Sequence, residues 1–147
     1  MGEAETTTSE VKAASRAGGA LRGWLLGLLG WLVPGLGHLV LRKYDRAIVF
    51  FVSVTAMAGL GLGMGAKLYG PVIDRSQGAF VTLLHTLGFI GDLGVVLYYT
   101  LAKLAGMGEH YLPRASGDYG TVFFLCAGLL NLLTALDAYD IAVGKKE

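Results

Sequence analysis

The sequence predicts an all-α integral membrane protein, a bundle of about four transmembrane helices. Three observations carry this prediction: 54% of the 147 residues are hydrophobic, only 16% are charged, and the mean hydropathy is +0.57. A typical soluble domain has roughly 25% charged residues. A soluble fold of this size leaves a large fraction of its surface exposed and could not bury so many apolar side chains. Lipid is therefore the expected solvent for most of the chain.

Residues 1–20 differ from the rest of the chain. They are polar and low in complexity, and they show no periodic apolar face. We therefore expect a disordered N-terminal tail. The apolar run that begins at Leu21 has no small-residue cleavage site after it, so we interpret it as a retained anchor. Residues 21–147 form the transmembrane helical domain in this prediction.

Four apolar stretches follow the tail. Each is close to the ~20 residues that a helix needs to cross the ~30 Å hydrocarbon layer. The predicted spans are residues 23–41, 47–66, 79–101 and 120–139. Tyrosines stand near most of their edges, which is typical of side chains at the level of lipid headgroups.

The basic residues predict an orientation for these four spans. Seven of them fall on the side of the N-terminus and five on the other side, where the five are Arg42, Lys43, Arg46, Lys103 and Arg114. Cytoplasmic loops carry an excess of Lys and Arg. Both termini are therefore expected in the cytoplasm.

The first span is irregular, because the run Pro34, Gly35, Leu36, Gly37 and His38 interrupts it. A proline in a helix interior costs roughly 3 kcal/mol, through its missing donor and its ring clash. We predict a helix that is broken or kinked at this proline. A kinked span and a half-helix that turns back both fit the sequence, and the length of the stretch favours the kinked span.

Residues 31–39, followed by a basic turn, resemble the hairpin of many small bacterial membrane proteins, which has a Pro-Gly-Leu-Gly-His or Gln core. Two-transmembrane-domain proteins share a related pattern. Residues 128–144 are similar to the end of an uncharacterised bacterial four-span family. Related hairpins often carry Tyr-x-Gly-Arg after the histidine, where this chain has Val-Leu-Arg-Lys at residues 40–43. The resemblance implies a multi-pass protein of the bacterial inner membrane and no particular activity.

The third stretch carries a polar face that is a candidate for chemistry. Asp92 lies near its middle, where an aspartate costs about 2.5–3.5 kcal/mol on insertion scales. His85 and Tyr99 lie two turns before and after it on the same helical face, and Gly88 and Gly91 flank that face. A protonatable seam is one interpretation, and a single interhelical hydrogen bond to the aspartate is the other.

Two further polar residues stand in apolar surroundings. Asn131 lies in the middle of the fourth stretch, and we expect it to bond across helices, with Asp92 as a candidate partner. Lining a solute path is the alternative role for Asn131. We expect His38 to bond a carbonyl that Pro34 leaves open. Ligation of a haem or a pigment by His38 or His85 is the alternative, because an axial site needs only one well-placed histidine.

Glycine is frequent, with 23 residues. In membranes, small residues spaced by four let helix backbones approach each other closely. The glycines expected to pack helices, within the bundle or between subunits, are Gly23, Gly27, Gly59, Gly61, Gly63, Gly65, Gly88 and Gly91.

Several classes of protein lack support. The single cysteine, Cys126, excludes an intrachain disulfide, and we expect a buried, inert thiol there. The net charge of +1 and the lack of a basic stripe argue against nucleic-acid binding. No serine lies in a nucleophile elbow, so we expect no enzyme. Asp137 and Asp140 are expected at a solvated membrane edge, and no metal or cofactor site is predicted.

The sequence therefore favours a structural or accessory membrane subunit that packs with a partner or with a second copy. The alternative is a small channel or a transporter of protons or solutes that uses the face of His85, Asp92 and Tyr99. A haem- or pigment-binding subunit is a further alternative.

Overall fold

The computed structural model describes residues 19–71, 78–108 and 115–146, and this part of the chain contains helices and no strand. An N-terminal helix covers residues 19–32. It is followed by α2 (Leu36–Val40), α3 (Tyr44–Gly63), α4 (Ala79–Leu93), α5 (Val96–Leu104) and α6 (Ala115–Ala142). The all-α prediction is confirmed. Most of the predicted disordered tail lies outside the described residues.

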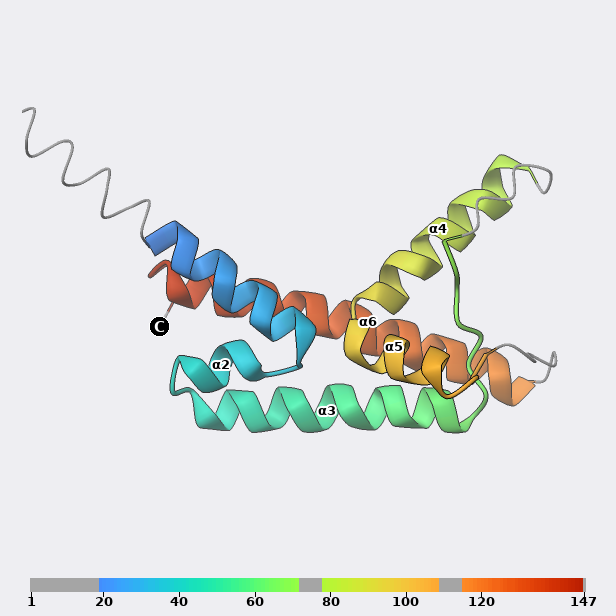
Figure 1. The fold of residues 1–147 in the computed structure, drawn as a ribbon, viewed down its shortest axis with the longest axis horizontal. Helices are drawn as coiled ribbons and strands as arrows, with labels where there is room; N and C mark the ends of the chain where they lie inside the picture. Colours follow the sequence, from blue (N-terminus) through green and yellow to red (C-terminus); the bar gives the residue numbers. More distant parts are fainter. Residues whose placement is uncertain (1–18, 72–77, 109–114, 147) are drawn as a thin grey trace, which may run out of the picture.

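The long helices α3 and α6 lie side by side and run in opposite directions (Figure 1). They are the two described helices that are, each alone, long and apolar enough to cross a membrane. Small residues let them approach, since a methyl group on Gly61 would lie 2.8 Å from the carbonyl oxygen of Gly120. Val54 and Phe124, both without exposed surface, continue this contact toward the middle of the pair.

The first predicted span is a hairpin. The N-terminal helix runs along the C-terminal half of α6, the chain turns at residues 33–35, and α2 runs back (Figure 1). A methyl group on Gly37 would lie 2.7 Å from the carbonyl oxygen of Leu26. In a continuous helix these two residues would be about 16 Å apart along the axis. We call residues 19–40 the N-terminal hairpin. The predicted break at Pro34 is confirmed, and of the two forms that fitted the sequence the structure has the half-helix that turns back, so the kinked span favoured for residues 23–41 is wrong.

The turn of this hairpin has a clear local cause. Pro34 has no donor with which to continue the helix, and Gly35 adopts a left-handed φ of 79°. A side chain on Gly35 would also meet the carbonyl oxygen of Ala47 at 2.5 Å. Within the turn, the amide of Leu36 donates to the carbonyl of Val33 at 3.1 Å.

The third predicted span is also broken, and here no proline is present. The axes of α4 and α5 differ by 99° across a break at Gly94 and Val95. Gly94 lies against the backbone of Gly128 in α6, where no side chain would fit. From the break α5 runs along α3, to which it is joined by a 2.6 Å hydrogen bond between Tyr98 and Thr55. We call these two helices the α4–α5 hairpin.

The number of membrane-spanning helices is therefore smaller than predicted. Two described helices are long and apolar enough, or three spans if the bent α4–α5 pair counts as one, where the sequence predicted four. The physical reason is the same in both broken stretches. Each was long enough to cross a membrane only on the assumption that the helix runs straight through its glycine-containing middle.

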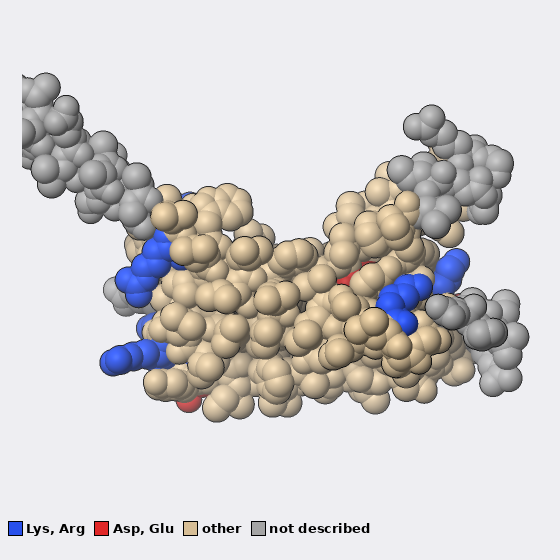
Figure 2. All heavy atoms as spheres, in the orientation of Figure 1, with Lys and Arg blue, Asp and Glu red and all other residues tan. Residues whose placement is uncertain are grey.

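The N-terminal hairpin also changes the distribution of charge. On the face shown in Figure 2, the Lys and Arg side chains gather at the two ends of the molecule, with a belt of other residues between them. By their positions next to the helix ends, six basic residues belong to the end where α2 meets α3 and α6 finishes, and two belong to the opposite end. The six are Arg22, Arg42, Lys43, Arg46, Lys145 and Lys146, and the two are Lys67 and Lys103. Among the eight described basic residues the ratio is thus six to two. The prediction had placed residues 42–46 on the side opposite the N-terminus, and the hairpin brings them back to it.

Candidate functional site

The centre of the molecule is organised by Asn131, which projects from the middle of α6 and has no exposed surface. Its Nδ2 donates one hydrogen bond to the carbonyl of Trp31 and one to the carbonyl of Gly94, each at 2.8 Å. Both carbonyls lie where a helix ends and so lack an intrahelical donor. The indole Nε1 of Trp31 in turn donates to the carbonyl of Leu93 at 2.8 Å. One side chain of α6 therefore supplies donors to the backbone at both helix breaks.

Asp92 does not bond to Asn131, so that predicted pairing is wrong. The Asp92 side chain is fully buried, and its Oδ2 accepts a 2.6 Å hydrogen bond from the backbone amide of Tyr69. Tyr69 lies in the segment that leads from α3 toward α4. This aspartate thus fastens α4 to that segment just before the break.

The three residues of the predicted polar face meet around Tyr69. The hydroxyl of Tyr99 donates to the carbonyl of Tyr69 at 2.9 Å, and the ring of His85 lies edge-on to the Tyr69 ring, with centroids 5.4 Å apart. Gly88 lies beneath that ring, where a methyl group would be 2.7 Å from it. Because the helix breaks between Asp92 and Tyr99, the two do not share one helical face as predicted. They come together only through Tyr69.

Tyr69 was not among the residues predicted to form a site. A tyrosine in a polar joint between two apolar stretches is typical of the membrane interface, so its local sequence carries no sign of a buried contact. Its environment is nevertheless distinctive. Burial, and secondly the nearby Asp92, raise the pKa of the Tyr69 phenol above its ordinary value.

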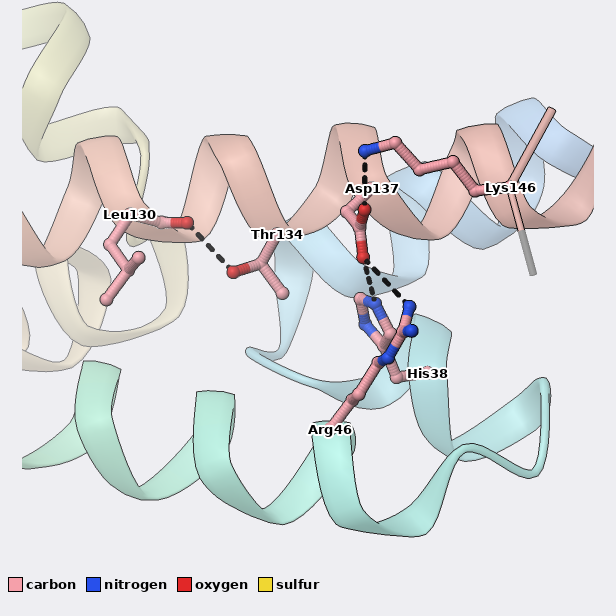
Figure 3. A network of polar contacts seen from close by, with 6 residues as sticks. All are labelled: His38, Arg46, Leu130, Thr134, Asp137 and Lys146. Atoms are coloured by element: carbon pink, nitrogen blue, oxygen red, sulfur yellow. Dashed lines mark hydrogen bonds and ion pairs between the residues drawn. The ribbon is translucent and has the colours of Figure 1, made fainter.

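A second polar cluster joins the N-terminal hairpin to α6 (Figure 3). His38 has no exposed surface, and its Nε2 donates to Asp137 Oδ2 at 3.1 Å. Arg46 Nη1 lies 3.8 Å from the same oxygen, and Lys146 Nζ donates to Oδ1 at 2.9 Å. The His38 ring also packs against Phe50, with centroids 5.0 Å apart. We call His38, Arg46, Asp137 and Lys146 the basic-end cluster.

This cluster corrects two predictions. His38 bonds to a carboxylate of α6 and not to a carbonyl freed by Pro34, and at this break it is the Asn131 amide that donates to an open carbonyl, that of Trp31. Asp137 is not simply solvated, since three cationic or donor groups converge on its two oxygens. The hydrogen bond to Asp137 raises the pKa of the Lys146 ammonium group.

The glycines expected to pack helices fall into two groups. A methyl group on Gly23, Gly27, Gly61, Gly88 or Gly91 would lie within 3.4 Å of another part of the chain. By contrast, Gly59, Gly63 and Gly65 have nothing within 4 Å of such a methyl group. Gly65 has a left-handed φ of 81°, which accounts for glycine there. Gly59 and Gly63 thus mark an open face of α3.

Three buried polar atoms have no hydrogen-bond partner among the described residues: His38 Nδ1, Asp92 Oδ1 and Asn131 Oδ1. Within the same residues, no group of three or more His, Cys, Asp or Glu side chains is placed to hold a metal ion. His38 has no exposed surface to offer a haem. Cys126 is exposed and not buried as expected, because it lies on the outer side of α6.

Comparisons with known proteins give one match. A family model described as "Family of unknown function (DUF6677)" matches residues 25–147, which include most of the N-terminal hairpin, the whole α4–α5 hairpin and both long helices. No curated protein and no solved structure matches the chain. Since the family model covers well over half of the sequence, the chain belongs to the DUF6677 family of unknown function.

Proposed function

We propose that this membrane protein is a structural or accessory subunit. It packs with a partner protein or with a second copy of itself. One observation carries the proposal: the buried polar side chains of the described residues are used to hold the chain's own elements together. Asn131 bonds to both helix breaks, Asp92 bonds to Tyr69, and His38 bonds to Asp137. A solute path would require such groups to face water, and none of these three buried residues has exposed surface.

The open face of α3 supports a packing role. Gly59 and Gly63 lie one turn apart, and neither contacts another helix. In lipid, helix association depends on close backbone approach, so exposed small residues spaced by four favour a helix–helix contact. We infer that this face receives a helix of the partner or of the second copy.

Cysteine crosslinking in native membranes tests this proposal. In a Cys126→Ser background, Gly59→Cys places a thiol on the open face, and Val122→Cys, at a residue that is 57% exposed on α6, is the matched control. We expect Gly59→Cys to give a crosslinked product of defined mass, either a dimer or one stoichiometric partner. A result in which both positions react alike, or neither reacts, contradicts the proposal.

Transport through Asp92 is a second candidate function. It is favoured by Asp92 Oδ1, which is buried and has no hydrogen-bond partner among the described residues, because ionisable residues within membrane helices often mark ion pathways. A proton-flux measurement in liposomes with the Asp92→Asn variant tests it. Wild-type flux equal to that of empty liposomes excludes transport.

The haem or pigment alternative has a separate test, the absorbance spectrum of the purified protein.

We also propose an orientation in the bacterial inner membrane. The end that carries six of the eight described basic residues is proposed to face the cytoplasm. The antiparallel arrangement of α3 and α6 supports this orientation, because it puts the turn between α2 and α3 at the same end as the C-terminal end of α6.

A further inference from the structure

A pocket of about 340 Å³ opens between α3 and α6 at the basic end of the molecule. Its apolar lining includes Phe50, Leu130 and Leu133, and its charged lining includes Asp137, Asp140 and Lys146. On α6 the leucines precede the aspartates by one to three turns, so the apolar part lies deeper along the helix and the charged part lies toward its end. The pocket is therefore amphipathic along the direction of the two long helices.

Two cations keep unused donors at this part of the pocket: Lys146, which lines it, and Arg46, which is not a lining residue but lies beside the lining residue Asp137. Arg46 Nη1 lies 3.8 Å from Asp137, which is beyond hydrogen-bond distance, and the Arg46 side chain is 46% exposed. An ammonium group has three donors, and the Lys146 ammonium group uses one of them on Asp137. Lys145 pairs with Asp140 at 3.7 Å. Arg46 and Lys146 thus keep donors for an anion.

The end of the molecule around the pocket is basic. The described residues of this end include six basic side chains and three acidic ones, Asp45, Asp137 and Asp140. Basic pockets between membrane helices are a recurrent binding site for anionic lipid headgroups.

We propose that this pocket binds a phospholipid with an anionic headgroup. Its phosphate accepts hydrogen bonds from Arg46 and Lys146, and one acyl chain lies along Phe50, Leu130 and Leu133. A free phosphate ion would satisfy the cations but would leave the apolar part of the pocket unused. The match of a charged outer part to an apolar inner part therefore selects a lipid. This inference does not depend on the proposed packing function.

Thermal unfolding of the full chain in mild detergent tests the proposal with three probes: phosphatidylglycerol, phosphatidylcholine and inorganic phosphate. We expect phosphatidylglycerol to raise Tm by at least about 3 °C, and the other two probes to leave it unchanged. The double variant Arg46→Gln, Lys146→Gln should lose this shift. Arg22→Gln removes an exposed cation near the same end that neither lines the pocket nor pairs with Asp137 or Asp140, and it should keep the shift.

A second variant separates binding from folding. Leu133→Trp fills the apolar part of the pocket, leaves every charge in place, and changes a side chain that is 64% exposed. It should keep the Tm measured without lipid and lose the shift with phosphatidylglycerol. Any of three results overturns the proposal: no shift with phosphatidylglycerol, an equal shift with phosphatidylcholine or inorganic phosphate, or a shift retained in both pocket variants.

Discussion

The N-terminal hairpin and the α4–α5 hairpin break their helices in different ways. The first break has a proline and a glycine with a left-handed φ of 79°. The second has neither, and its helix ends where Gly94 meets the backbone of Gly128. Both breaks present a carbonyl to the same donor group, the side-chain amide of Asn131. The comparison teaches that a proline is not required when a neighbouring helix supplies both the close contact and the missing donor.

The hairpins also differ in how their outer ends are held. The basic-end cluster fastens the N-terminal hairpin to α6 through His38 and Asp137. In the second hairpin, α4 points away from α6 on the N-terminal side of the break (Figure 1). The buried residues of α4 are confined to Gly88, Gly91 and Asp92, close to the break. The first hairpin is therefore expected to be the more rigid of the two.

The largest expected effect comes from Gly128→Ala, which acts on the second break. Its methyl group would overlap the carbonyl oxygen of Gly91, so one of the two helices must shift. We expect the free energy of unfolding in detergent to fall by about 3 kcal/mol, at the upper end of the cost of overpacking. The control is Gly19→Ala, whose methyl group would meet nothing within 4 Å and which should change stability by less than about 0.5 kcal/mol. Equal effects of the two substitutions would show that the Gly91–Gly128 contact does not hold the break.

Asn131→Leu should weaken both hairpins together. It removes two hydrogen bonds and leaves the carbonyls of Trp31 and Gly94 without a donor. We expect a loss of about 2 kcal/mol in the free energy of unfolding. Hydrogen exchange should rise at residues 31–35 and at residues 93–96 in the same variant. Faster exchange at only one of the two breaks would refute the shared role of Asn131.

Trp31→Phe tests the direct link between the two breaks. The substitution keeps an aromatic ring and removes only the donor to the carbonyl of Leu93. The expected loss is about 1 kcal/mol, the usual contribution of one hydrogen bond. Trp24→Phe, which changes an indole that is 69% exposed, is the control and should be nearly neutral. A Trp31→Phe protein as stable as this control would contradict the link.

Pro34→Ala should have the smallest effect, if the comparison of the two breaks is right. Gly35, the packing of Gly37 against Leu26 and the amide of Asn131 all remain. We expect the free energy of unfolding to change by less than about 1 kcal/mol, with the hairpin intact in a spin-label distance measurement between residues 25 and 39. Lengthening of that distance toward the ~21 Å of a continuous helix would show that the proline is what holds the turn.

These differences explain what could be predicted from the sequence. The break at Pro34 could be predicted because proline acts locally on its own helix. The break at Gly94 could not, because it depends on Gly128, which belongs to another helix. Asn131 could be recognised as a residue that bonds between helices, but its partners depend on where the two breaks meet.

The two polar clusters show the same limit. His38 and Asp137 are 99 positions apart in the chain, and no local pattern links them. Asp92, His85 and Tyr99 could be grouped by their spacing, yet the residue on which they converge, Tyr69, lies in a joint that resembles an ordinary interface. Chemistry-bearing residues were therefore easier to predict than their contacts.

The most direct test of the fold is the side of the membrane on which the turn between α2 and α3 lies. In a Cys126→Ser background, Lys43→Cys, Lys146→Cys and Lys67→Cys are each labelled with a membrane-impermeant maleimide, in intact cells and in inverted vesicles. The α4–α5 hairpin predicts that residues 43 and 146 are labelled from the same side and residue 67 from the other, because only α3 and α6 then cross the membrane between residues 43 and 146. Labelling of residue 43 from the side opposite residue 146 would mean that α4 and α5 together cross the membrane as a third span, and the account of two hairpins would be wrong.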